Sequence, residues 1–167
     1  FLRYSLDNNP VQQVALSQEI EALMLYLNIE KTRFGDRLSL AFDLDERAKT
    51  ALIPSLLLQP LVENAVIHGI EPLADAGMVR ITGSCHGRLM MLTVEDDGKG
   101  MTAEGIVEME NKLGKAMDEE MGCGVWNVHQ RMRLRYGEEA GLSFSSSPLG
   151  GLQVTLQWLL PPTDNEY

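Results

Sequence analysis

The 167-residue sequence has little cysteine, little positive charge and no long apolar stretch. Its two cysteines, Cys85 and Cys123, lie far apart and form no metal-ligand spacing, which favours a reduced, cytosolic-type compartment. No uninterrupted apolar run approaches the roughly 18 residues of a membrane-spanning helix. The sequence has no signal peptide and begins at Phe1 without an initiator methionine, so we expect a piece of a longer protein.

Acidic residues outnumber basic residues by 24 to 14, which gives a formal net charge of -10 at pH 7. This balance argues against a nucleic-acid surface and against contact with an acidic membrane surface, because both need clustered Lys and Arg. A polyanionic ligand must therefore be held locally, by backbone amides at glycine turns, by a helix N-terminus or by a bound metal. The length and the 44% hydrophobic content indicate one globular domain with a core.

Hydrophobic periodicity predicts an α+β fold: a two-layer α/β sandwich with helices on one face of a mixed, mostly antiparallel sheet of about five strands. Alternation of apolar and polar residues predicts strands at residues 38–44, 78–84, 89–95, 142–147 and 152–160. Helical spacing predicts helices over residues 17–34, 54–69, 106–113 and 124–136. Gly137 is a fitting end for the last helix.

Several local details are expected within these elements. Ser17 is a plausible N-cap of its helix. One face of that helix is expected to be buried through Ile20, Leu23, Met24 and Leu27. Pro54 is expected in the first turn of the next helix, whereas Pro60, one to two turns later, must remove a hydrogen bond. Residues 45–50 are expected to form a polar turn.

The most informative stretch is LLLQPLVENAVIHGI at residues 56–70, an apolar segment of helical length. Glu63 and Asn64 stand side by side in it, where a core helix more often carries apolar or small residues. Two polar side chains in that setting suggest a ligand. Adjacent helix positions point about 100° apart, so the carboxylate and the amide would address two sides of one bound object.

Two glycine-rich turns follow, EDDGKG at residues 95–100 and GCGVWN at residues 122–127. Both let the backbone approach a ligand, and the second precedes a helix whose N-terminal amides favour phosphate oxygens. Taken alone the signal is weak, because glycine pairs at turns are more often only turns. No P-loop motif and no dinucleotide-binding G-x-G-x-x-G after a strand is present. Asp96 at a strand end needs a donor when buried, and an adenine amino group would be one.

Residues 101–121 connect the two glycine turns. They are predicted to form either a mobile lid or, equally, a solvated surface helix with a loop.

Together the three stretches resemble the ATP-binding domain shared by gyrase, the heat-shock chaperone, histidine kinases and MutL, the GHKL or HATPase_c fold. LLLQPLVENAVIHGI is similar to the N box of LytS-type sensor histidine kinases, EDDGKGM to their first glycine box and GCGVWNVHQRMRLRYG to their second. The helix ending in KTRFGDRL resembles the segment that precedes this domain. The likeness covers nearly all of residues 2–161, and three boxes in order with this lead-in form a strong signal.

This resemblance implies a sandwich in which ATP lies between the helices and the sheet, with a lid over the phosphates. By position it implies that Asn64 ligates Mg²⁺ and that Asp96 accepts the adenine amine. His68 is implied as a pocket-lining or structural side chain. Further residues implied at the nucleotide, the first two on the adenine side and the others on the phosphate side, are Gly98, Gly100, Gly122, Cys123, Gly124, Val125, Asn127 and Arg131.

Glu63 is expected either to polarise a metal-bound water or to position its helix. The general base of gyrase-type ATPases lies four residues before the Asn, and Pro60 occupies that position here. Family sequences often have Asn at the place of Asp97 and a Gly-Thr pair at the place of residues 151–152; the sequence departs from the family at both places. His86 is expected in a hairpin turn and His129 on a helix surface.

The resemblance divides the chain into a helical tail of the dimerisation and phosphoacceptor region (1–35), an ATP-binding catalytic domain (36–162) and a tail (163–167). The acceptor histidine is missing, so the implied acceptor lies on a helix elsewhere in the same protein or in its dimer mate. The implied whole protein is a sensor histidine kinase of the cytoplasmic membrane, with this domain in the cytoplasm, that signals to a response regulator of the LytTR type.

Two alternatives remain open at this point. One is an ATP-hydrolysing switch or a serine kinase of the anti-sigma type, against which Pro60 and the RFGDRL lead-in speak. The other is a degenerate interaction module that has lost nucleotide binding, against which Asn64, Asp96 and the glycine pairs speak.

Overall fold

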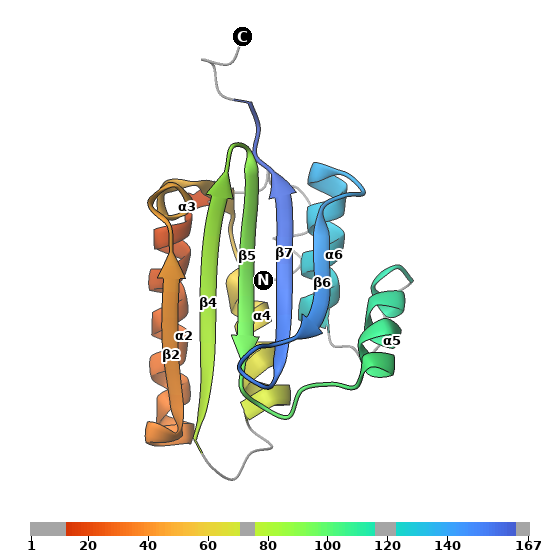
Figure 1. Ribbon diagram of the computed structural model, residues 1–167. Coiled ribbons are helices and arrows are strands. Elements are labelled where there is room, and N and C mark those ends of the chain that lie inside the picture. The colour runs from red at the N-terminus through yellow and green to blue at the C-terminus, as the bar shows by residue number, and fades with distance from the viewer. Residues whose placement is uncertain (1–12, 71–75, 116–122, 163–167) are drawn as a thin grey trace.

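A computed structural model describes residues 13–70, 76–115 and 123–162 of the chain, which fold as two layers (Figure 1). The main sheet has five strands in the order β2-β4-β5-β7-β6. Its strands are β2 Leu38–Leu44, β4 Gly77–His86, β5 Leu89–Asp96, β6 Gly141–Ser146 and β7 Leu152–Leu159. β2 pairs with β4 in parallel and the other three pairs are antiparallel, which confirms the predicted mixed α+β class.

The helices cover one face of this sheet, with α2, α4 and α6 behind the strands and α5 beyond the β6 edge in Figure 1. Their bounds are α2 Leu16–Phe34, α3 Glu46–Thr50, α4 Leu58–Asn64, α5 Ala103–Leu113 and α6 Cys123–Tyr136. A 3-10 turn, Gly35–Arg37, follows α2, and a π-helical turn, Ala65–Ile70, continues α4. None of the described helices is both long and apolar enough to cross a lipid bilayer.

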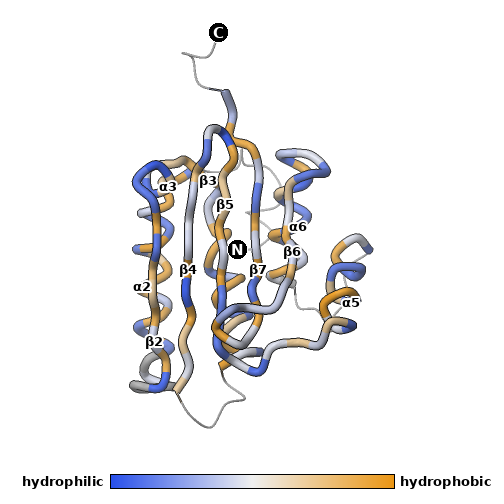
Figure 2. The backbone as a smooth tube through the Cα atoms, in the orientation of Figure 1, coloured by the Kyte–Doolittle hydropathy of each residue, from blue (hydrophilic) through white to orange (hydrophobic). Residues whose placement is uncertain are grey.

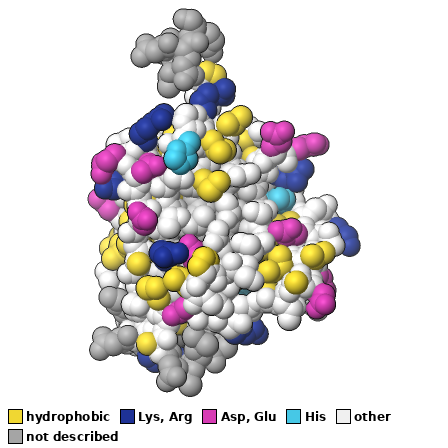
Figure 3. Space-filling model, viewed as in Figure 1, with side chains coloured by type: hydrophobic (Ala, Val, Ile, Leu, Met, Phe, Trp, Pro, Cys, Tyr) yellow, Lys and Arg dark blue, Asp and Glu magenta, His cyan; other side chains and the backbone are white. Residues whose placement is uncertain are grey.

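The core lies between the two layers because each strand directs alternate side chains toward the helices. Along β7 the hydropathy alternates residue by residue (Figure 2), and Val154 and Leu156 are buried while Gln157 is exposed. Leu23 and Leu27 of α2 belong to the same apolar core. The face without helices is seen in Figure 3, where uncharged side chains predominate over the central strands. The Arg80–Glu95 ion pair, at 3.1 Å, bridges β4 and β5.

Some sequence predictions about α2 are wrong. The helix begins at Leu16, so Ser17 lies inside its first turn and is not the N-cap. Met24 is 38% exposed, whereas Leu16 is fully buried. The rest of the predicted face is confirmed, because Leu23 and Leu27 are each 1% exposed and Ile20 packs against the core. The strand β1, Gln13–Ala15, leads directly into this helix.

The predictions for the two prolines are wrong, since Pro60 takes the first-turn place predicted for Pro54 and Pro54 lies in a strand. Pro54 ends β3, Leu52–Pro54, which pairs with β1 in a separate two-stranded sheet. Pro60 is the third residue of α4, in the first turn, where backbone N–H groups have no intrahelical partner. Pro60 therefore removes no helical hydrogen bond, contrary to the prediction.

Two further expectations fail for reasons of hydrogen bonding. The predicted turn at 45–50 contains the short helix α3, because the Asp45 carboxylate caps it by accepting the Ala48 amide at 2.7 Å. His129 is 6% exposed rather than on the surface. Its Nδ1 accepts the amide of Leu142 at 3.0 Å and so ties α6 to β6.

Candidate functional site

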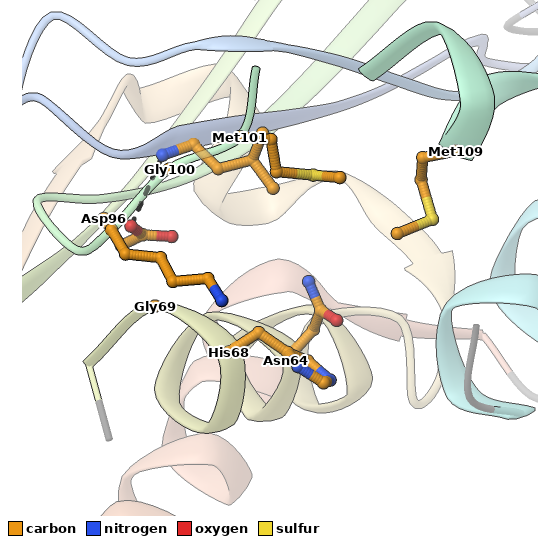
Figure 4. A pocket seen from close by; sticks show the side chains of 9 residues that line it. Asn64, His68, Gly69, Asp96, Gly100, Met101 and Met109 are labelled. Atoms are coloured by element: carbon orange, nitrogen blue, oxygen red, sulfur yellow. Dashed lines mark hydrogen bonds between the residues drawn. The ribbon is translucent and has the colours of Figure 1, made fainter. Parts of the chain in front are cut away.

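A pocket of about 200 Å³ opens between the α4 segment and the connection that follows β5. Figure 4 shows Asn64 and His68 on the helical side, Asp96 across from them, and Met109 reaching in from α5. The full lining is Asn64, His68, Gly69, Asp96, Lys99, Gly100, Met101, Met109 and Leu152. The structure therefore brings together four of the residues singled out from the sequence: Asn64, His68, Asp96 and Gly100.

Asp96 is the buried acid of this pocket. Asp96 is the last residue of β5 and is 3% exposed. Oδ1 accepts the amides of Gly98 at 2.9 Å and of Leu152 at 3.3 Å. Burial raises the pKa of Asp96, and the neighbouring charge of Asp97 adds to this, while the two amide hydrogen bonds oppose it. Within the described part of the chain both bonds end on Oδ1, which leaves Oδ2 available to accept from a ligand.

Three glycines enclose this carboxylate. A Cβ at Gly69 would lie 2.8 Å from Asp96 Cγ, and one at Gly151 would overlap Asp96 Oδ1. A Cβ at Gly98 would overlap the Gly69 carbonyl. A larger residue at Gly69 or Gly151 would displace the acid, and one at Gly98 would displace the Gly69 backbone, so the chain packs this closely only because side chains are absent. Gly100 has a φ of 66°, which lets the chain turn there into the pocket wall.

Glu63 faces another direction from Asn64. Its Oε1 accepts Gln59 Nε2 at 3.0 Å on the same helix. Burial raises the pKa of Tyr26 on α2 to about 12, and the negative charges of Glu30 and Glu63 contribute to that rise. Glu63 therefore lies toward α2 and does not line the pocket.

The second glycine box lies at the start of α6. Gly124 packs against α4, because a Cβ there would lie 3.1 Å from Pro60 Cβ. Val125 is buried and Asn127 is partly buried. The helix begins at Cys123, while Gly122 lies outside the described residues.

Arg131 of α6 reaches the segment that precedes α4. Its guanidinium donates to the carbonyls of Ser55 at 2.7 Å and Leu56 at 3.3 Å. In the described part of the chain, four α6 residues singled out from the sequence do not line the pocket: Gly124, Val125, Asn127 and Arg131.

Five lining residues were missed by sequence reasoning: Gly69, Lys99, Met101, Met109 and Leu152. Gly69 and Lys99 stand inside the motif stretches, so their position was a usable signal. Met109 carried no such signal, because only the packing of α5 against the rest of the domain brings it to the pocket.

A nucleotide fits this arrangement. Asp96 Oδ2 offers an acceptor for an exocyclic amine, and Met101, Met109 and Leu152 offer apolar contacts for a base. The volume of about 200 Å³ is below the roughly 300–1,000 Å³ of sites that enclose whole drug-sized ligands, so the pocket suits the base rather than the entire nucleotide. The described residues contain no cluster of three or more His, Cys, Asp or Glu side chains able to hold a metal. Asn64 contributes one amide oxygen, a ligand type that suits Mg²⁺ when phosphate oxygens and water complete the coordination.

Comparison with known proteins agrees with this geometry. The family model described as histidine kinase-, DNA gyrase B-, and HSP90-like ATPase matches residues 51–162, and the histidine kinase family model matches residues 1–38. The sensor histidine kinase YpdA of Escherichia coli is 38% identical over 140 residues, covering 83% of this chain and 24% of that protein. The sensor protein LytS of Streptococcus agalactiae is 31% identical over 150 residues, covering 90% of this chain and 26% of that protein.

The fold has a solved counterpart in the catalytic domain of histidine kinase ThkA, with a TM-score of 0.70 and 14% identity over 93% of this chain and 100% of that one. The chain spans about a quarter of the length of YpdA and LytS. The chain thus belongs to the family of histidine kinase-, DNA gyrase B- and HSP90-like ATPases, and within it resembles the ATP-binding domains of sensor histidine kinases, the LytS type among them.

Proposed function

We propose that this domain binds Mg-ATP, with the adenine in the pocket against Asp96 and the phosphates extending from it toward Asn64 and the start of α6. The observation that supports this best is the buried Asp96 carboxylate, whose Oδ1 is held by two backbone amides while Oδ2 remains for a donor. Adenine carries an amino donor on its ring, and guanine carries a carbonyl at the same place. The pocket should therefore select adenine.

Each remaining residue of the motifs has a proposed role. Asn64 would ligate Mg²⁺, which neutralises phosphate charge when bound, and His68 would line the phosphate side one helical turn later. Glu63 faces Gln59 and Tyr26, which supports a helix-positioning role over activation of a metal-bound water. Gly98 and Gly100 would shape the adenine side. Asn127 and Arg131 would support the phosphate side. The phosphates themselves would be contacted by backbone amides at the start of α6, those of Gly122, Cys123, Gly124 and Val125.

Phosphoryl transfer requires mainly positioning and charge neutralisation from the protein. We propose that residues 36–162 present the terminal phosphate to a histidine outside this chain, on the acceptor helix of the same protein or of its dimer mate. Residues 1–35 would be the tail of that dimerisation region, and residues 163–167 a C-terminal tail. A response regulator of the LytTR type would receive the phosphate next. The whole protein would be held in the cytoplasmic membrane with this domain on the cytoplasmic side.

Steady ATP hydrolysis by this domain is disfavoured by the direction of Glu63 and by Pro60 at the general-base position. The purified chain should therefore bind Mg-ATP without continuous phosphate release. Sustained release would instead favour the ATPase alternative.

Thermal unfolding with and without nucleotide tests the proposal. At a hundred times its dissociation constant, Mg-ADP should add about 2.7 kcal/mol, or roughly 5–10 °C for a chain of this size. Mg-GDP should give no comparable shift. Asp96→Asn preserves the size of the side chain but presents an NH₂ group to the adenine amine, so it should lose the Mg-ADP shift.

Asp43→Asn is the matched control, since Asp43 is an exposed acid on β2, away from the pocket lining. It should keep the full shift. Absence of a shift in the natural chain at millimolar Mg-ADP would refute nucleotide binding and favour a degenerate interaction module. A full shift in Asp96→Asn would refute the role of Asp96 alone.

A further inference from the structure

Glu19 of α2 is a buried carboxylate that binds the start of another helix. It is 6% exposed. Oε1 accepts the amide of Leu56 at 3.0 Å, and Oε2 accepts those of Leu57 at 2.6 Å and Leu58 at 3.1 Å. The first N–H groups of a helix have no intrahelical partners, so this one side chain accepts hydrogen bonds from three amides at the start of α4.

Arg131 of α6 binds the same segment from its carbonyl side, through Ser55 and Leu56. Burial lowers the pKa of Arg131, and the negative charge of Glu19 opposes this, so the two ionised groups interact. Leu56 has a φ of 64°, in the left-handed region that leucine rarely adopts. Glu19 and Arg131 together hold a strained segment, and we call them the Glu19–Arg131 clamp.

The clamp joins α2 and α6 to the segment from which α4 starts, and α4 and α6 are the two helices that are proposed to hold the phosphates. α4 begins at the clamped segment and carries Asn64 to the pocket. α6 carries Arg131 and, in its first turn, Gly124, which lies so close to α4 that a Cβ added to it would be 3.1 Å from Pro60 Cβ. The clamp thus sets both the starting point of α4 and the distance from α4 to the N-terminus of α6.

We propose that Glu19 and Arg131 are positioning residues for the phosphate side of the nucleotide site. Neither touches the pocket. They act by fixing Asn64 and the α6 amides relative to each other, while Asp96 on the sheet positions the adenine independently. This inference rests on the proposed Mg-ATP function. It adds Glu19, which lies outside the three motif boxes, and it explains the supporting role of Arg131 by its hold on the start of α4.

The test separates the two ends of the nucleotide. Dissociation constants of adenosine and of Mg-ADP are measured by NMR titration of this chain, well below the lowest melting temperature of any variant. Glu19→Gln replaces one acceptor oxygen by an NH₂ group, and Arg131→Lys keeps the charge but loses the fork that reaches two carbonyls. Both should weaken Mg-ADP binding roughly tenfold, the equivalent of one or two lost hydrogen bonds, and leave adenosine binding within about twofold.

Asp45→Asn is the matched control for stability. Asp45 is likewise a carboxylate that accepts two backbone amides, of Ala48 and Cys85, but it joins α3 to β4 away from the pocket. It should lower the melting temperature without changing the ratio of the Mg-ADP and adenosine constants. Arg131→Lys carries the test if Glu19→Gln does not fold.

An unchanged ratio in a folded clamp variant overturns the inference, and so does an equal change of the ratio in Asp45→Asn. Equal weakening of adenosine and Mg-ADP would show a general structural role and would also overturn it. Failure of the natural chain to bind either ligand would refute the proposed function itself, which is a distinct result because it needs no variant.

Discussion

Gly69 lies directly against the carboxylate of Asp96, so closely that a Cβ on Gly69 would come within 2.8 Å of Asp96 Cγ. The backbone of the helical turn after Asn64 thus contacts the carboxylate at the end of β5, and this contact forms one wall of the pocket. Asp96 cannot swing aside without loss, because Oδ1 is held by the amides of Gly98 and Leu152.

Gly69→Ala should therefore damage both stability and binding. Overpacking of this kind costs about 1–3 kcal/mol of unfolding free energy, and displacement of the acid should remove the Mg-ADP shift. Gly114→Ala is the control, because its nearest contact would be an ordinary 3.7 Å, and it should change stability by under about 0.5 kcal/mol. Urea unfolding with and without Mg-ADP measures both effects. A full nucleotide shift in Gly69→Ala would contradict the contact.

Asp96→Asn should stabilise the nucleotide-free protein at neutral pH. Burial raises the pKa of Asp96 in the folded state, so the folded chain binds this proton more tightly than the unfolded chain does. The associated stability is fully present below 3.8, the ordinary pKa of this carboxyl in the unfolded chain, and is lost as pH rises through the raised folded pKa. A neutral amide avoids that loss.

The melting temperature without nucleotide is the readout, at pH 7 and at pH 4. The advantage of Asp96→Asn should be larger at pH 7 than at pH 4. A lower melting temperature than the natural chain at pH 7 would mean that the ionised carboxylate stabilises the fold.

His129 should make the fold sensitive to mild acid. Burial lowers the pKa of His129 and the charge of Arg133 lowers it further. Stability from this group is fully present above the unfolded pKa of 6.5 and is lost as pH falls from there toward the lowered folded pKa, because protonation removes the acceptor for Leu142 N–H. His129→Asn keeps an acceptor at a similar place and does not titrate. The loss of unfolding free energy between pH 7.5 and pH 5.5 should be smaller in His129→Asn, and equal losses would exclude this role.

Substitutions at Gly124 and Pro60 should be coupled in their effect on the free energy of unfolding. Gly124→Ala places a Cβ 3.1 Å from the rigid Pro60 ring and should cost about 1–3 kcal/mol of unfolding free energy. In a Pro60→Gly background the opposing Cβ is gone, so the same substitution should become neutral or stabilising through the helix propensity of alanine. A double-mutant cycle by urea unfolding measures the coupling. Simple additivity would show that α4 and α6 do not meet at this point.

The strands were predicted well because their signal is local. The alternation at residues 38–44 matches β2, and both hairpins lie within two residues of their predicted bounds. The first part of the chain was predicted less well, because β1 pairs with β3 from residues about 40 positions away. That pairing fixes Pro54 as extended and moves the start of α4 to Leu58.

The candidate site divides in the same way. Asn64, His68, Asp96 and Gly100 were found from motifs and line the pocket. The glycines that pack against Asp96 were not found, because Gly69 and Gly151 come close to its carboxylate only when the helix and the β6–β7 turn fold around it. By its place in the sequence Glu19 is an ordinary first-turn acid of α2, yet its partners are amides 37 to 39 residues later.

By itself, the sequence determined the α+β class, the strand positions and the three stretches that identify the family, because periodicity and glycine turns are properties of neighbouring residues. Tertiary structure alone decided which polar groups share the pocket. Glu63 and Asn64 are adjacent in sequence, but α2 packs near one and the pocket opens at the other. The surroundings of a helical side chain depend on what packs against that side of the helix, and packing joins residues that the sequence keeps far apart.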